Sequence, residues 1–303
     1  MIVDDYRALR DGLGAHRLRR DVLAVTGRDA AAYLQGQCSQ DLDGLAIGAT
    51  VDSLLLEPDG KLTALVRVTR LADDRFVVDV DGGFGDAVTA RLARFKLRSK
   101  LTIERLDWAT VALRGPRVVD TPVAAGVSLQ FHWNEIDGLD LLGPDVESAV
   151  PADVRWCGDD AWEAVRIEAG IPTMGRELDG RTIAAEAGLV ERTVSFSKGC
   201  YTGQELVARL DARGNRVARR LCGIVLDAPA TEAGGLVGAD LTVAGGDGKV
   251  VGTVTSAAWC PGVGAVAGLA YVHRSVDVGA TVDIGSTAGE PVTGRVVTLP
   301  MTG

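Results

Sequence analysis

The chain has 303 residues, of which 47% are hydrophobic, so it can bury a substantial core in two or three domains. No apolar run approaches the roughly 20 residues that a membrane helix needs, and the charged first residues do not resemble a secretory signal, so we expect a cytoplasmic protein with no membrane contact. The net charge of -9 argues against strong, sequence-independent nucleic-acid binding, because such binding requires many cations.

The chain contains five cysteines and three histidines. The cysteines are an odd number and widely separated, which indicates a reducing compartment rather than a disulfide framework. No histidine has a second histidine, cysteine or carboxylate at the spacing typical of zinc sites. The sequence therefore predicts no resident metal.

The first half of the chain predicts an alternation of helices and strands. Thr26 or Gly27 can cap a short helix that ends near Gly36, because Ala30, Tyr33 and Leu34 recur at helical spacing. The stretch 49–83 alternates apolar runs with Pro-Asp-Gly-Lys and Ala-Asp-Asp turn signals, which predicts three antiparallel strands. A helix at roughly 84–95 follows.

Strand patterns return at 100–106, 108–115 and 137–144, and helical periodicity returns at 159–170, where Gly170 and Pro172 predict a stop. From about 221 the composition changes to short valine-rich strands punctuated by glycine, which is typical of a small β-barrel or sandwich. The chain as a whole is thus predicted to be α+β.

Cys200 lies in the stretch SFSKGCYTGQELVARL, just ahead of an apparent helix. Thr202 and Glu205 have the spacing of a capping box, which predicts a helix that begins at Gly203 and ends near Gly214. The positive helix end and a nearby lysine would favour the thiolate over the thiol. A structural cysteine in a glycine-bounded loop is the alternative.

Glu168 is predicted in the last turn of the helix at 159–170, where the helix dipole disfavours a carboxylate. A ring N–H beside an exocyclic amine, as in a pterin, would supply two donors to it. Trp162 could add a flat stacking surface. A solvated glutamate and a core tryptophan are the alternatives.

The eight residues KGCYTGQE at 198–205 resemble the signature of the YgfZ family. These are folate-binding proteins related to the aminomethyltransferase T-protein of the glycine cleavage system and to a mitochondrial iron-sulfur assembly factor. Other stretches that resemble the family are TGRDAAAYLQGQCSQDL, FKLRSKLTI, RIEAGIPTMGRE, VARLDARGNRVARRL and GKVVGTVTSA. The resemblance thus spans nearly the whole chain.

The resemblance implies three domains in a ring around a central folate pocket. We expect residues 1–215 to form a folate-binding module of two interleaved α+β subdomains, with the inserted one at about 48–115. Residues 216–303 would form the C-terminal β-barrel that closes the ring. The implied cofactor is tetrahydrofolate or a one-carbon derivative of it.

The resemblance also implies residue roles. Cys200, with Lys198 beside it, matches the reactive group of the family. Glu168 matches the glutamate that holds the pterin, and Trp162 matches a position associated with folate. The other residues that we expect at the folate are Gln204, Glu205 and Arg209.

One departure from the T-proteins bears on function. Where T-proteins carry paired aspartates, one of them catalytic, this chain has about Thr63 and Ala64. Aminomethyl transfer would then lack its acid-base group.

We therefore expect a tetrahydrofolate-binding accessory protein that supports assembly or repair of iron-sulfur clusters, including those of tRNA-modifying enzymes, with client proteins as partners. The alternatives are a folate-dependent aminomethyl or methyl transferase and a folate-sensing module.

Overall fold

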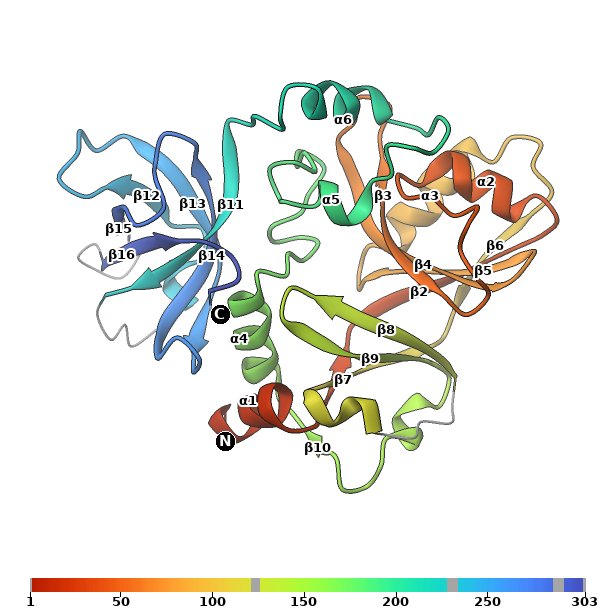
Figure 1. Ribbon diagram of the computed structural model, residues 1–303, viewed down its shortest axis with the longest axis horizontal. Coiled ribbons are helices and arrows are strands. Elements are labelled where there is room, and N and C mark those ends of the chain that lie inside the picture. Colours follow the sequence, from red (N-terminus) through yellow and green to blue (C-terminus); the bar gives the residue numbers. More distant parts are fainter. Residues whose placement is uncertain (1, 121–125, 228–233, 286–291, 302–303) are drawn as a thin grey trace.

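The computed structural model describes residues 2–120, 126–227, 234–285 and 292–301 (Figure 1). Within these residues the strands form two five-stranded sheets and one closed barrel, which we call the first sheet, the second sheet and the barrel. Helices accompany the two sheets, and the barrel comes last in the chain, which confirms the predicted α+β fold with a C-terminal β-barrel. None of the described helices is long and apolar enough to cross a membrane.

The first sheet has the strand order β10-β1-β7-β9-β8. Its strands are β1 (Gly14–Leu18), β7 (Ala109–Arg114), β8 (Val127–Trp133), β9 (Ile136–Gly143) and β10 (Arg155–Trp156). Its helical segments are α1 (Ile2–Asp11), η1 (Pro116–Asp120), η2 (Val146–Ala149) and α4 (Asp159–Ala169). Helix α4 ends where the sequence predicts, because Gly170 caps it in the left-handed conformation with φ 69°.

The second sheet is antiparallel, with the order β3-β4-β5-β2-β6. Its strands are β2 (Arg20–Thr26), β3 (Thr50–Leu56), β4 (Leu62–Ala72), β5 (Arg75–Asp81) and β6 (Thr102–Leu106). Its helices are α2 (Ala30–Gln37), α3 (Gly85–Phe95), α5 (Val190–Thr193) and α6 (Gln204–Asp211). The helix predicted to end near Gly36, the helix at 84–95 and the three predicted strands are therefore confirmed, but α2 is capped at Asp29 rather than at Thr26 or Gly27.

The chain crosses between the two sheets at a single residue. Strand β1 ends at Leu18 in the first sheet and β2 begins at Arg20 in the second, so Arg19 alone joins them. The strands of the second sheet consequently span 20–106, and the bounds 48–115 expected for the inserted subdomain stay a prediction. Strand β2 belongs there because it pairs with both β5 and β6, whereas β7 pairs with β1 and β9.

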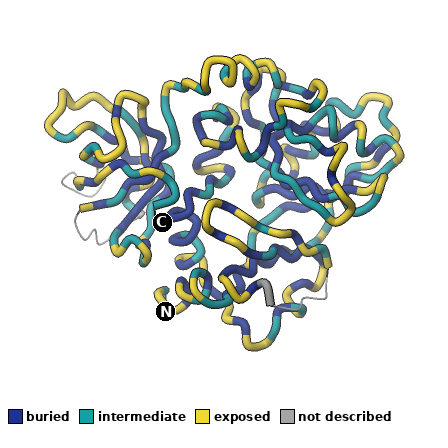
Figure 2. The backbone as a smooth tube through the Cα atoms, viewed as in Figure 1, coloured by how far each residue is buried: buried dark blue, intermediate teal, exposed yellow. Residues whose placement is uncertain are grey.

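The barrel closes in the order β11-β14-β13-β12-β15-β16, and closure removes the sheet edges. Its elements are β11 (Arg219–Leu226), η3 (Gly234–Leu236), β12 (Asp240–Val243), β13 (Val250–Cys260), β14 (Ala265–His273), β15 (Thr281–Ile284) and β16 (Val292–Val297). It packs on α4 through Cys260, Ala267 and Leu269, and α4 is largely buried between the barrel and α1 (Figure 2).

The start of α6 differs from the prediction. The helix begins at Gln204, with Gly203 as its N-cap at φ 85° and no side-chain capping bond, so the predicted capping box is wrong. A Cβ at Gly203 would lie 2.6 Å from the carbonyl oxygen of Glu57, which leaves room only for glycine. The side chain of Gln204 instead accepts a 3.2 Å hydrogen bond from the main-chain N–H of Tyr201.

Candidate functional site

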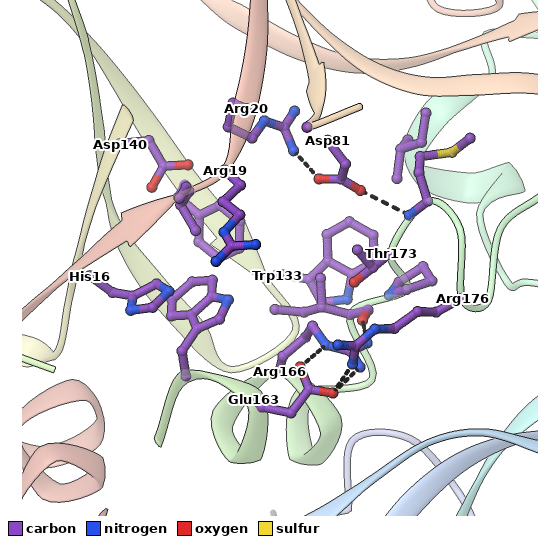
Figure 3. Close-up of a pocket in the computed structure, with 18 of the residues that line it drawn as sticks. His16, Arg19, Arg20, Asp81, Trp133, Asp140, Glu163, Arg166, Thr173 and Arg176 are labelled. Atoms are coloured by element: carbon purple, nitrogen blue, oxygen red, sulfur yellow. Dashed lines mark hydrogen bonds and ion pairs between the residues drawn. The ribbon is translucent and has the colours of Figure 1, made fainter. Parts of the chain in front are cut away.

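A cavity of about 550 Å³ lies where the first sheet, the second sheet and α4 meet (Figure 3). The five consecutive residues 16–20, which contain the crossing between the sheets, line one side of it. Residues of α4 and of the loop after it, 171–174 among them, line another. Among the described lining residues none belongs to the barrel, so the barrel stands behind α4 rather than at the cavity wall.

Trp162 lies in this cavity, as the resemblance implies for a folate-associated position. Its ring stacks on the imidazole of His16, with centroids 4.9 Å apart and planes 8° from parallel. Trp133 and Phe131 are further aromatic lining residues. The cavity therefore presents several flat apolar surfaces that can stack on a planar ligand.

His16 is buried beneath the ring of Trp162. Its Nδ1 lies 3.0 Å from the carbonyl oxygen of Cys157, which can only accept, so Nδ1 carries the hydrogen and donates it. Burial lowers the pKa of His16, which favours the neutral imidazole. Nε2 then keeps its lone pair and lies 3.9 Å from a carboxylate oxygen of Asp159.

A buried ion network joins the two sheets beside the cavity. Asp140 of β9 pairs with Arg67 of β4 and, at 2.7 Å, with Arg114 of β7. Burial alone would raise the pKa of Asp140, but the two guanidinium charges together hold that pKa below its ordinary value. Arg67 also pairs at 2.8 Å with Asp79, which is shared with Arg20.

Arg114 has no solvent exposure, like Asp79 and Asp140 of the same network. Its guanidinium lies 3.7 Å from the ring centre of Phe131 and 5.3 Å from that of Trp162. Within the described residues, its Nε and Nη2 hydrogens have no acceptor. Unpaired buried donors are costly, and the pairing of Arg114 with Asp140 offsets part of that cost.

Glu163 is a cavity residue that the sequence reasoning missed. It accepts a 2.6 Å hydrogen bond from Arg166 and also binds Arg176. Burial opposes ionisation of Glu163, but the two arginines hold its pKa below the ordinary value. The signal was present in the sequence, since Glu163 and Arg166 are three residues apart on one helix.

Glu168 lies outside the lining of the cavity. Its carboxylate is fully buried and accepts hydrogen bonds from the Tyr6 hydroxyl at 2.5 Å and from the Gly262 main-chain N–H at 2.9 Å. In this structure it therefore joins α4, α1 and the turn between β13 and β14. Its contact with a pterin stays a prediction, and protein donors are what compensate its helix-end position here.

Cys200 is exposed, whereas the other four cysteines are buried. Like Glu168, it is not among the residues that line the cavity. Phe196 in the same loop is also exposed. The loop therefore presents Cys200 to the outer surface, and its reactivity stays a prediction.

Lys198 forms hydrogen bonds with main-chain carbonyl oxygens near α2. Its ammonium donates to the carbonyl oxygens of Gln35, Cys38 and Gln40 at 2.7, 2.7 and 2.9 Å. Burial lowers its pKa. Lys198 thus fastens the motif loop to the C-terminal end of α2, where a cation is favoured by exposed carbonyls.

The remaining predicted folate contacts lie on α6. Glu205 and Arg209 are exposed, and Gln204 is occupied with the start of the helix. None of the three lines the cavity. Of the predicted site residues, the structure places only Trp162 at the cavity.

Comparison with known families and structures places the fold in a class. Residues 8–128 match the GCVT N-terminal domain, and residues 219–302 match the glycine cleavage T-protein C-terminal barrel domain. The crystal structure of the glycine cleavage system aminomethyltransferase T from Bartonella henselae has the same fold, with a TM-score of 0.84 and 21% identity over 99% of this chain and 89% of that one. The chain thus has the fold of the T-proteins, including the C-terminal barrel.

Curated proteins of similar sequence show which members of this class the chain resembles. An uncharacterized protein of Haemophilus influenzae is 30% identical over 64% of this chain and 66% of its own length. The tRNA-modifying protein YgfZ of Klebsiella pneumoniae is 29% identical over 63% and 64%, and an aminomethyltransferase of Corynebacterium jeikeium is 24% identical over 98% and 90%. These relatives support the assignment of the chain to the YgfZ family, and the chain spans slightly less than two thirds of the first and second of them.

Proposed function

We propose that this protein binds tetrahydrofolate, or a one-carbon derivative of it, in the cavity beside α4. The observation that carries the proposal is the stacked pair of Trp162 and His16 on the wall of a cavity of about 550 Å³. Cavities of this size enclose ligands of a few hundred daltons, and flat aromatic walls suit a pterin ring. Its membership of a T-protein-like family supports the same ligand.

The polar groups of the cavity fit a pterin as well. A pterin ring carries an N–H and an exocyclic amine, which require acceptors. Neutral His16 offers Nε2, and Asp159 and Asp160 offer carboxylates at the start of α4. These residues would bind and orient the ring, which when bound supplies the nitrogen that carries a one-carbon group.

For the cellular role, we propose an accessory protein of the cytoplasm that supports iron-sulfur cluster assembly or repair. The exposed position of Cys200 and Phe196 supports a thiol that meets a partner protein rather than the cavity ligand. A relative named as a tRNA-modifying protein is consistent with clients among tRNA-modifying enzymes. Complementation of a strain lacking the gene with wild type and Cys200→Ser, with cluster-dependent enzyme activity as readout, tests this role.

The alternative is an aminomethyltransferase, which the relatives with that name support. Strand β4 supplies no carboxylate to the cavity lining that could act as the acid or base of this reaction. Thr63 donates a 3.0 Å hydrogen bond to Glu57 and does not line the cavity, and the β4 residues that do are Leu65, Val66 and Arg67. A reconstituted glycine cleavage assay with lipoyl carrier protein separates the two functions. We expect no appreciable turnover, and turnover comparable to a T-protein would favour the alternative.

Calorimetry with 5-formyltetrahydrofolate, a stable reduced folate, tests the binding proposal. Trp162→Ala should weaken binding by about 5- to 150-fold, since stacking on an aromatic ring contributes about 1–3 kcal/mol per base in comparable sites. Trp259→Ala is the control, because Trp259 is exposed on the barrel. Equal affinity of the wild type and Trp162→Ala would place the ligand elsewhere.

A further inference from the structure

Arg19 is a cavity cation without a partner. Of the described arginines that line the cavity, it alone forms no ion pair or side-chain hydrogen bond. Each of the other six lining arginines forms an ion pair: Arg17 with Glu147, Arg20 with Asp79 and Asp81, Arg67 with Asp79 and Asp140, Arg114 with Asp140, Arg166 with Glu163 and Glu177, and Arg176 with Glu163. Figure 3 shows the Arg19 side chain reaching in among the residues around the cavity.

The main chain holds Arg19 in place. It lies between two paired strands, and its carbonyl oxygen accepts a 2.8 Å hydrogen bond from the N–H of Gly82. A Cβ at Gly82 would come within 3.3 Å of the Arg19 Cβ, so the two loops pack closely. The base of the side chain is therefore fixed, while its guanidinium is free to meet a ligand.

The ion pairs next to Arg19 are complete without it. Arg20, Arg67 and Arg114 share their ion-pair partners Asp79, Asp81 and Asp140, so the neighbouring network is balanced without Arg19. The unpaired charge of Arg19 in the cavity therefore points to an anionic group on the ligand.

We propose that Arg19 binds a carboxylate of the ligand, so that the cavity selects a reduced folate through the acidic glutamyl tail as well as the pterin ring. This inference rests on the proposed function. A guanidinium presents paired donors that match the two oxygens of a carboxylate. A phosphate has the same chemistry, and a nucleotide would be the other source of such an oxyanion.

The experiment compares three ligands by calorimetry: 5-formyltetrahydrofolate, its glutamyl dimethyl ester, which keeps the length but loses the charges, and adenosine monophosphate. The variants are Arg19→Gln and, as a control, Arg213→Gln, since Arg213 is exposed and does not line the cavity. Arg19 has no protein partner to lose, so Arg19→Gln should keep the melting temperature of the wild type.

We expect the wild type and Arg213→Gln to bind the acid about 10- to 150-fold more tightly than the ester, because hydrogen bonds to charged groups contribute about 1.5–3 kcal/mol. Arg19→Gln should bind both equally, at the affinity of the ester. The same preference for the acid in Arg19→Gln would overturn the inference while leaving folate binding intact. Binding of the monophosphate in place of both folates would overturn the carboxylate assignment and the proposed function, and binding of none of the three ligands would do the same.

Discussion

The hydroxyl group of Tyr6 donates a 2.5 Å hydrogen bond to Oε2 of Glu168, across 162 positions of the chain. Burial raises the pKa of Tyr6, and the hydrogen bond to the neighbouring carboxylate raises it further. The other carboxylate oxygen accepts from Gly262 in the barrel. One buried side chain thus connects the beginning, the middle and the end of the molecule.

We expect Glu168→Gln to lower the free energy of unfolding by about 1–3 kcal/mol, because an amide cannot accept on both sides and leaves one buried donor unpaired. Urea denaturation measures this, with Glu135→Gln as the exposed control. Unchanged stability together with weakened binding of 5-formyltetrahydrofolate would instead assign Glu168 to the pterin, as the family resemblance implies.

We expect Asp140→Asn to destabilise the protein by about 3–5 kcal/mol. The change keeps the shape of the side chain but leaves Arg67 and Arg114 buried with less counter-charge, and breaking a buried ion pair on one side has a cost of that size. Asp153→Asn, at an exposed position, should stay within about 0.5 kcal/mol of the wild type. Equal effects of the two changes in chemical denaturation would contradict the structural role of the network.

The stability of the protein should depend on pH through His16. Its pKa in the folded state lies below the ordinary 6.5, so the unfolded chain binds the proton more readily and stability is lost as the pH falls below about 6.5. His16→Phe keeps a ring against Trp162 but cannot titrate. Melting temperatures between pH 5 and 7.5 should therefore fall more steeply for the wild type, and parallel curves would count against a buried neutral His16.

Alkylation of the folded protein should label Cys200 well before the other cysteines. Cys200 is exposed, whereas burial raises the pKa of both Cys38 and Cys157 to about 11 and shields all four remaining thiols. Mass spectrometry after brief exposure to iodoacetamide should find one label in the wild type and none in Cys200→Ser. Several early labels in Cys200→Ser would show that the buried thiols are accessible in solution.

Local sequence patterns predicted much of the fold, because interactions between residues close in sequence determine its turns and helix ends. The turn signals between β3, β4 and β5 and the glycine stop after α4 act within a few residues, and the structure confirms them. The start of α6 was wrong because a distant contact, the carbonyl of Glu57 against Gly203, determines the backbone there.

The site was harder to predict, because its geometry depends on residues far apart in sequence. The helix-end position of Glu168 correctly indicated that a donor was needed, but only the fold shows that Tyr6 and Gly262 supply it. Lys198 is two residues from Cys200 and yet binds carbonyls around α2. Proximity in sequence did not indicate these contacts, and the effect of Lys198 on the thiol stays a prediction.

The single-residue crossing at Arg19 makes one short segment both a wall of the cavity and the joint between the two sheets. A change in the angle between the sheets would therefore alter the shape of the cavity, and a ligand that fits one angle would stabilise it. Occupancy of the cavity could in this way be transmitted to the outer surfaces of both sheets without a separate regulatory element.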